Sequence, residues 1–431
     1  MFEFTVIIIA LVLAVALGFI TKVNSGLYAL AFSFLIGTFV LHYSVGQLLA
    51  MWPVKICFVL FSVNFFYNFF VLNGTMDKLA SKILWAFRKA PQYLPFGIFI
   101  VATVIGALGS GLYGTVAMLA PVAYVISKKT KTNPLPGQIS VMYGASAGGA
   151  LFITSTGAAV RTIIADCGYE AQATTYAMYN FLGTLLLAIL YVTISFFIFR
   201  KDFKAIDTVS LDRPEPFDKK QKQSLALIGI MVFCLVAPYL LSYLIKGNAV
   251  VDMLVKYMDV GFLSIILSIV AILMKLGDQK QALSKVSWNV ILLISGISIL
   301  VSIASDLGVI EAMTDLVSAS GSNVFISVLM AFIAAVMSVF SSANGVVIPT
   351  LYPAVQGLSL STGLSAGFLF TVIKVGSSAT GVSPMSTAGS LSLGCAPDDK
   401  TENFMFKAFC VCPFIGLALV LAIIAVVSLF A

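Results

Sequence analysis

The chain has 431 residues, of which 60% are hydrophobic and only 10% are charged. Soluble globular proteins are roughly 45–50% apolar and about 25% charged, so this composition excludes a soluble enzyme, a nucleic-acid-binding protein and a disordered chain. At about 20 residues per helical span plus loops, the length accommodates roughly ten spans. The sequence therefore predicts an all-α polytopic membrane protein that is embedded in the lipid bilayer. The net charge of +7 has to be judged by where the charges lie.

Long apolar runs separated by short polar segments follow one another along the chain. They cover about 4–20, 26–48, 54–73, 94–127, 138–166, 174–199, 224–245, 260–275, 288–306, 324–357, 364–395 and 404–430. The first run is preceded by no basic region and closed by no cleavage motif, so we expect a retained span rather than a signal peptide. The one hydrophilic stretch, 200–223, predicts a linker between two halves, 1–199 and 224–431.

Two of the runs, 94–127 and 324–357, are too long for one span and too short for two. Each carries small and hydroxyl residues in its middle, namely Gly109, Ser110, Gly111 and Gly114 in the first and Ser341, Ser342 and Gly345 in the second. A polar interruption at that depth indicates a turn inside the membrane. We interpret both runs as re-entrant helical hairpins that enter and leave on the same side.

Two further runs, 138–166 and 364–395, combine glycines with clustered hydroxyl residues. The interrupting glycines and proline are Gly144, Gly148, Gly149, Gly157, Gly376, Gly381, Pro384 and Gly389. Glycine and proline also occur as plain packing residues in spans. Non-helical backbone at membrane depth, however, is tolerated only where it is buried in protein or lines a cavity. The clustering therefore favours two broken helices that contribute to a site.

A shift of 232 positions superposes the unusual parts of the two halves without a gap. The identical pairs include Ser110 and Ser342, Leu119 and Leu351, Pro121 and Pro353, Gly144 and Gly376, Ser146 and Ser378, Gly149 and Gly381, and Gly157 and Gly389. Each half also has the same order of elements: three spans, a hairpin, a broken span and a span. Because that order crosses the membrane five times, the second repeat must be inverted, which is an architecture typical of secondary transporters.

The placement of lysine and arginine tests the inversion, because positive charges favour cytoplasmic loops. With the N-terminus outside, 20 of the 25 Lys and Arg residues fall on the cytoplasmic side. Only Lys246 and Lys256 fall outside, and Lys55, Arg161 and Lys374 lie within spans. We therefore expect extracytoplasmic termini and a cytoplasmic linker. The first hairpin is then expected to open to the cytoplasm and the second to the exterior.

The hairpin tips and the breaks resemble a known superfamily. The sequence from Gly109 through Thr115 to Pro121, and that from Ser341 through Gly345 to Pro353, resemble the two hairpin tips of the ion transporter superfamily. That superfamily includes the divalent anion:sodium symporters and the MatC-like dicarboxylate carriers. The segments after each hairpin, around 148–156 and 381–387, look like its unwound loops. The resemblance implies a dimerising scaffold and a transport domain that moves as an elevator.

The resemblance also implies which residues hold the substrate carboxylates and which coordinate sodium. The implied substrate residues are Ser110, Gly111, Tyr113, Gly114, Thr115, Thr154, Ser155, Thr156, Ser341, Ser342, Asn344, Gly345, Pro384, Ser386 and Thr387. The implied cation ligands are Ser110, Ser146, Gly148, Gly149, Ser342, Asn344, Ser378 and Thr380. The Ser-Asn-Thr triplet that is usual in the symporters is absent from both tips, which leaves the substrate and the number of coupled sodium ions open.

Lys374 is the charge that the pattern places deepest in the membrane. It lies about 11 residues into its span, hence roughly 15 Å deep at 1.5 Å per residue, where a charge costs at least about 2.5–3.5 kcal/mol. One interpretation is a cation that contacts an anionic substrate or takes the role of a coupling ion. The alternative is a lysine that snorkels or caps the carbonyls of the broken helix. Lys55, Arg161 and His42 are expected near a membrane face.

The resulting hypothesis is a secondary active transporter of small organic anions, di- and tricarboxylates first, in a bacterial inner membrane. Sodium or a proton would be the coupling ion and no other cofactor is expected, with a homodimer as the assembly. Sodium-independent exchange with Lys374 in place of an ion is the alternative. A channel and an intramembrane enzyme are the other classes, and one histidine without midplane carboxylates argues against catalysis. The six cysteines show no disulfide or zinc spacing.

Overall fold

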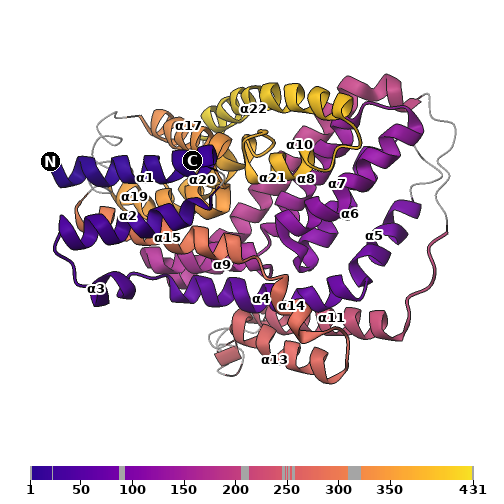
Figure 1. Cartoon of the computed structure of the whole chain (residues 1–431), viewed down its shortest axis with the longest axis horizontal. Coiled ribbons are helices and arrows are strands. Elements are labelled where there is room, and N and C mark those ends of the chain that lie inside the picture. Colours follow the sequence, from indigo (N-terminus) through magenta and orange to yellow (C-terminus); the bar gives the residue numbers. More distant parts are fainter. Residues whose placement is uncertain are drawn as a thin grey trace. The chain divides into compact units, whose positions relative to one another are not determined.

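The structure is a computed structural model. It describes residues 2–21, 23–86, 93–204, 213–244, 248, 250, 253–254, 258–308 and 322–429. Within these residues every regular element is a helix (Figure 1). Five helical stretches among them are long and apolar enough to cross a membrane: Val54–Leu72, Gly111–Lys128, Ser155–Asp202, Trp288–Asp306 and Asp399–Val427. Shorter apolar helices of 10–17 residues accompany them. The predicted all-α membrane fold is thus confirmed.

Some sequence predictions fall on other parts of the chain. Lys246 and Lys256, the two basic residues predicted outside, lie beyond the described residues, as does the stretch 205–212 of the linker. The described helices divide into two compact units, which are taken separately below. The first comprises Met1–Cys57, Val160–Tyr191 and Trp288–Ala431, and the second comprises Phe58–Ala159 and Val192–Ser287.

One part of the first unit is a bundle of α1 (Phe2–Thr21), α2 (Ser25–Phe39), α3 (Val45–Ala50) and α15 (Trp288–Asp306) (Figure 1). Helix α2 packs along both α1 and α15. The shared core is aliphatic and consists mainly of Ile7, Ala10, Ala14, Ala29, Leu48, Ile297, Leu300 and Ile303. Small residues in this core let the helices approach closely, as is typical of helix packing in membranes.

The other part of the first unit contains the second predicted hairpin and the second broken helix. The hairpin consists of α17 (Asn323–Phe340), η6 (Ala343–Val347), α18 (Ile348–Leu351) and α19 (Ala354–Thr362). The broken helix consists of α20 (Ala366–Ala379) and α21 (Thr387–Leu393), and α22 (Asp399–Val427) follows. Both hairpin arms contact α20, and α22 covers α17 and α20. The Asp398 carboxylate caps α22 by accepting from the Thr401 N–H at 2.9 Å.

The second unit contains the first predicted hairpin and most of the first broken helix. The hairpin consists of α6 (Leu94–Ile105), η3 (Gly106–Ser110) and α7 (Gly111–Thr130). The broken helix consists of α8 (Pro134–Gly149) and α9 (Ser155–Ile164). The Asn133 side chain caps α8, which has proline at its first position. Helices α6 and α7 both pack on α8. The two predicted hairpins and the two predicted broken helices are therefore present.

The remaining described helices complete the two units. They are α4 (Val54–Leu72), α5 (Thr75–Ala86), α10 (Ala173–Lys204), α11 (Lys219–Leu244), α13 (Val260–Leu273), α14 (Gln279–Ser284) and the short turns η4 (Ala165–Tyr169) and η5 (Glu170–Gln172). Helix α11 packs on α13, and α5 packs on α6 and α11. The chain thus leaves α4 through the amphipathic α5 before it enters the first hairpin.

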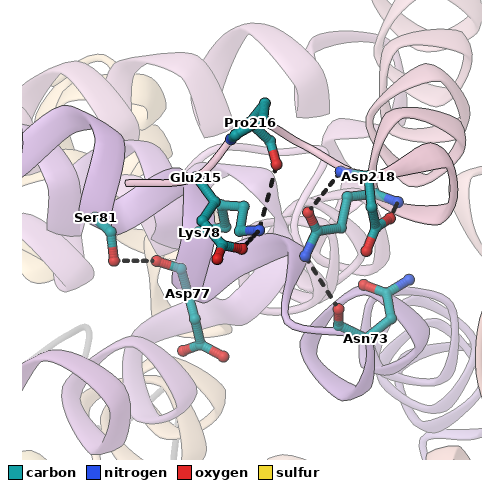
Figure 2. Close-up of polar contacts among 8 residues, drawn as sticks. Asn73, Asp77, Lys78, Ser81, Glu215, Pro216 and Asp218 are labelled. Carbon is teal, nitrogen blue, oxygen red and sulfur yellow. Dashed lines mark hydrogen bonds and ion pairs between the residues drawn. The ribbon is translucent and has the colours of Figure 1, made fainter. Parts of the chain in front are cut away.

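The C-terminal end of the linker, residues 215–217, packs against helix α5. Lys78 of α5 pairs with the Glu215 carboxylate at 3.4 Å and donates to the Pro216 carbonyl at 3.3 Å (Figure 2). The Lys82 ammonium lies 5.1 Å from the centre of the Phe217 ring, a cation–π contact. The residues that precede α11 are therefore held along α5 by side-chain contacts, and α11 begins where they end.

The packing of each hairpin on its broken helix recurs after 232 residues. A Cβ atom on Gly144 of α8 would lie 2.7 Å from the Phe99 carbonyl oxygen of α6. A Cβ atom on Gly376 of α20 would lie 2.6 Å from the Ala331 carbonyl oxygen of α17. Because real Cβ atoms do not approach this closely, both positions require glycine. The two hairpins therefore meet their broken helices at equivalent residues, as the sequence repeat predicts.

Candidate functional site

Each hairpin tip lies beside the break of the helix that follows it, which gives one centre in each unit. The first centre is the tip 106–115 with the break 150–154, and it belongs to the second unit. A Cβ atom on Gly149 would lie 3.2 Å from the Leu112 N atom, so the end of α8 touches this tip. The second centre is the tip 341–347 with the break 380–386, in the first unit, where η6 contacts α20.

A hydroxyl group braces each break in the same way. In the first centre, the Thr154 Oγ1 atom lies 2.7 Å from the Gly149 carbonyl oxygen and 2.8 Å from that of Leu151. It also accepts from the Gly157 N–H at 3.0 Å. Small hydroxyl residues commonly cap new helices in this manner. Thr154 therefore bonds to both sides of the break.

Ser386 makes the same three contacts in the second centre. Its Oγ atom lies 2.8 Å from the carbonyl oxygens of Gly381 and Ser383, and it accepts from the Gly389 N–H at 3.1 Å. Every atom pair is the one expected from the 232-residue shift. The hydroxyls of Thr154 and Ser386, predicted as substrate ligands, are thus engaged by the backbone of the breaks.

Lys374 distinguishes the second centre. Its side chain belongs to α20 and is buried, with 3% of the residue exposed. The Nζ atom donates to the Asn344 Oδ1 atom of the hairpin tip at 2.8 Å. The two residues are 30 positions apart, and the hairpin fold brings them together. The sequence placed Lys374 deep in the membrane, and the structure identifies its partner as a neutral amide.

The Lys374 ammonium has no counter-charge in the described part of the chain. The ion pairs found there join Lys55 to Asp166 and Lys78 to Glu215, and neither includes Lys374. An ammonium carries three N–H donors, of which one bonds to Asn344. A buried cation paired only with a neutral group bears a large desolvation cost. The second centre is therefore an electropositive site.

The backbone of the second tip adds to this positive character. Ser342 is extended, with φ −87° and ψ 123°, and its Oγ atom accepts from the Gly345 N–H at 3.1 Å. Ser342 is thus the N-cap of the helical arm that begins with one π-helical turn, a feature frequent at functional sites. Helix N-termini carry free N–H groups and a partial positive charge that favour anions. Ser341, also predicted as a ligand, donates to the Met337 carbonyl at 2.6 Å.

The first centre is built without a charge. Gly111 has φ +64°, a conformation that favours glycine, and it joins a π-helical turn to α7. Thr115 is buried, and its Oγ1 atom has no hydrogen-bond partner among the described residues. Tyr113 is half-buried and Gly114 is exposed. The side chains of Ser110 and of Thr387 in the second centre lie outside what the structure describes.

The residues predicted to coordinate a cation differ between the two centres. In the second, Asn344 Oδ1 accepts from the Lys374 ammonium, and Thr380 Oγ1 donates to the Ala335 carbonyl at 2.7 Å. Ser378 is buried, and its Oγ atom has no partner among the described residues. In the first, the Gly149 carbonyl accepts from the Thr154 and Thr156 hydroxyls, each at 2.7 Å. Of the other predicted cation ligands, Ser146 is half-buried and Gly148 is buried. Of the predicted substrate residues, Ser155 is buried and Pro384 is half-buried.

Outside the two centres, the charged and metal-ligating side chains that the structure describes are exposed, paired or widely spaced. Lys55 pairs with Asp166 at 3.1 Å, and both side chains are exposed. His42 is exposed as well. Across the described residues, no three His, Cys, Asp or Glu side chains are grouped closely enough to hold a metal ion. The six cysteines are unpaired and half-buried.

Comparisons with known proteins give a partial match to one family and a solved structure with a similar fold. Residues 1–149 match the family described as the dicarboxylate carrier protein MatC N-terminus, so the predicted resemblance to MatC-like carriers is confirmed over that part. No protein of curated function matches the chain. Among solved structures, the chain is similar to the YdaH transporter of Alcanivorax borkumensis, which is described as having an unusual topology. The match covers 88% of this chain and 86% of that one, with 14% identity and a TM-score of 0.57, and it shows the fold alone.

Proposed function

We propose that this chain is a secondary active transporter of small organic anions, with di- and tricarboxylates as its substrates. The observation that carries the proposal is the Lys374 ammonium, which is buried and hydrogen-bonded to a neutral amide. A buried cation without a counter-charge favours an anion, because the attraction offsets part of its desolvation cost. The match of residues 1–149 to a dicarboxylate carrier family supports a carboxylate as that anion.

In this proposal, the second centre holds one carboxylate group of the substrate. Lys374 has two further N–H donors to offer, and the N-terminal end of the hairpin arm offers backbone N–H groups beside Ser342 and Gly345. A carboxylate accepts several hydrogen bonds at once, so these donors suit it. The transport cycle is proposed to be elevator-type alternating access coupled to a cation.

The topology is part of the same proposal. The hydrogen bonds that recur after 232 residues support two structural repeats, and the asymmetry of Lys and Arg supports their inversion. We place both termini outside the cytoplasm and the linker inside, in the inner membrane of a bacterium, with two chains forming a homodimer. Single cysteines introduced at each terminus and in the linker test the orientation. In intact cells, a thiol reagent that does not cross the membrane should label the termini and not the linker.

Sodium-independent exchange is a second candidate, and one contact favours it. The Asn344 Oδ1 atom is a predicted cation ligand, and the Lys374 ammonium already occupies it. Two unit positive charges 4 Å apart repel by about 4 kcal/mol at the effective dielectric constant near a protein surface. A sodium ion would therefore bind poorly beside Lys374, and the ammonium would take the place of one coupling ion.

Uptake into proteoliposomes tests both candidates. The purified chain is reconstituted and offered a panel of labelled dicarboxylates and tricarboxylates, with and without an inward sodium gradient. We expect accumulation that depends on the gradient; counterflow without a gradient would support exchange instead. The Lys374→Met variant tests the role of the charge, because methionine keeps most of the length of the side chain without its ammonium group. The absence of both uptake and counterflow for every anion would contradict the proposed substrate class.

A further inference from the structure

The second arm of the second hairpin loses a backbone hydrogen bond next to a buried tyrosine, because Pro353 has no N–H. Helix α18 ends at Leu351 and α19 begins at Ala354, and Tyr352 and Pro353 between them keep helical backbone angles, with φ −63° and ψ −36° for the tyrosine and φ −56° and ψ −29° for the proline. The Tyr352 side chain is fully buried, and its ring centre lies 4.7 Å from that of Phe370 on α20. A proline that follows a helix end cannot continue the hydrogen bonding of that helix. The arm can therefore bend at this point unless its neighbours hold it.

The Tyr352 hydroxyl joins three segments of the chain. It accepts from the Asn180 Nδ2 atom of α10 at 2.9 Å and donates to the Phe370 carbonyl of α20 at 3.3 Å. Asn180 is also buried, with 1% of the residue exposed, in a run that is otherwise mostly apolar. Its Oδ1 atom has no partner among the described residues. The contact to Tyr352 is thus the hydrogen bond that the Asn180 side chain makes in the described structure.

This contact lies one helical turn from the lysine of the second centre. In a regular α-helix the carbonyl of residue 370 accepts from the N–H of residue 374. Helix α20 is consequently linked both to the tip and to the second arm of the second hairpin. Lys374 bonds to Asn344 at the tip, and the Phe370 carbonyl bonds to Tyr352 eight residues further along the hairpin.

The first hairpin lacks this arrangement. The residue 232 positions before Tyr352 is Ala120, and helix α7 continues through it and through Pro121, the equivalent of Pro353. The residue 232 positions before Phe370 is Gln138, whose amide donates to the Ala120 carbonyl at 2.9 Å. A direct side-chain bond from Gln138 thus joins arm and helix in the first hairpin, whereas the second uses a tyrosine hydroxyl that also contacts α10.

We propose that Tyr352 and Asn180 are positioning residues of the second centre, a role that rests on the proposed function. They hold the arm against α20 where Pro353 weakens its helix, fix Asn344 beside Lys374 and thereby set the affinity for the anion. Removal of the Tyr352 hydroxyl leaves the ring packed on Phe370 but frees the arm to bend at Tyr352 and Pro353. The hydrogen bond between Asn344 and the Lys374 ammonium is then formed for a smaller fraction of the time, and the anion binds to a less ordered site more weakly.

Two measurements on the full chain in lipid test the proposal. The first is backbone hydrogen exchange of residues 341–353, and the second is the KM and maximal rate of dicarboxylate uptake. For Tyr352→Phe we expect exchange and KM to rise by about fivefold to tenfold, the factor that corresponds to one buried hydrogen bond. The maximal rate should change by less than about twofold. Tyr67→Phe is the matched control, because the Tyr67 hydroxyl is buried without a described partner.

A double variant separates positioning from stability. Tyr352→Phe leaves the buried Asn180 amide without its bond, which lowers the melting temperature. Adding Asn180→Leu removes that orphaned amide, so the melting temperature should recover while KM and exchange stay raised. If Tyr352→Phe matches Tyr67→Phe in exchange and KM, or if the double variant recovers both, the positioning role is wrong. A wild-type chain without any uptake would refute the proposed function, and the exchange measurement would still decide whether Tyr352 holds the tip.

Discussion

The first and second centres share a backbone and differ in their chemistry. Thr154 and Ser386 brace the two breaks through equivalent atoms, and Gly144 and Gly376 let the hairpins approach equivalently. The positions that correspond to Lys374 and Asn344, 232 residues earlier, are Met142 and Leu112. The polar pair of the second repeat, a buried lysine and a half-buried asparagine, is therefore an apolar pair in the first. The two repeats therefore share the backbone geometry of the break and of the hairpin packing, whereas the buried ammonium occurs at this position only in the second repeat.

The charge is the element whose removal should have the largest effect. Lys374→Met gives the second centre the residue of the first at the equivalent position. We expect anion uptake to fall by at least about 30-fold, since loss of a desolvated charge at a ligand contact costs roughly 2–5 kcal/mol. Uptake by proteoliposomes at fixed protein content measures it. Normal uptake by this variant, with Met142→Leu as the control in the first centre, would contradict a direct role of the charge.

Substitution of Asn344 tests whether Asn344 and Lys374 act as a unit. Asn344→Leu leaves the Lys374 ammonium buried without its bond, which costs about 1.5–3 kcal/mol. The melting temperature of the detergent-solubilised chain should drop, and uptake should weaken. In Lys374→Met/Asn344→Leu, both residues match the first repeat, and we expect most of the lost thermal stability to return without uptake. Additive losses in the double variant would instead indicate that the two side chains act independently.

Substitution of Thr154 and Ser386, whose hydroxyls bond across the two breaks, tests whether the two centres are structurally equivalent. Thr154→Val and Ser386→Ala each remove a hydroxyl that caps a helix and bonds across a break. Loss of such a cap costs about 1 kcal/mol. The two variants should therefore lower the melting temperature by similar amounts. A much larger loss of uptake than of stability for Ser386→Ala alone would assign that hydroxyl to the substrate, as the sequence resemblance implies.

Much of this architecture could be read from the sequence. Overlong apolar runs with polar centres indicated both hairpins, and the glycine and hydroxyl clusters indicated both broken helices. The prediction that Gly144 and Gly376 interrupt those helices was wrong: they lie inside α8 and α20, where the lack of a side chain lets the hairpin arm approach. The depth of Lys374 followed from counting residues along a span. Its bond to Asn344 did not, because the hydropathy pattern does not reveal which face of α20 meets the hairpin tip.

The sequence also left out the contacts that bring distant segments together. Asn180 and Tyr352 are 172 residues apart, and nothing local marks them as partners. A polar residue in an apolar run was the available signal for Asn180, since such a residue needs a bond inside the membrane. The hydroxyls of Thr154 and Ser386 were predicted to face the substrate. Their bonds to the broken backbone follow from geometry that composition cannot supply.

The smallest expected effect concerns a second hydroxyl that only the first centre has. Thr156 donates to the Gly149 carbonyl, which also accepts from Thr154, and the residue 232 positions later is Ala388. Thr156→Ala should cost less than about 1 kcal/mol, because the carbonyl keeps its other bond. Its melting temperature should therefore lie between those of the wild type and Thr154→Val. If Thr156→Ala instead destabilises the chain as much as Thr154→Val, the two hydroxyls brace the first break jointly, and the equivalence with Ser386 is incomplete.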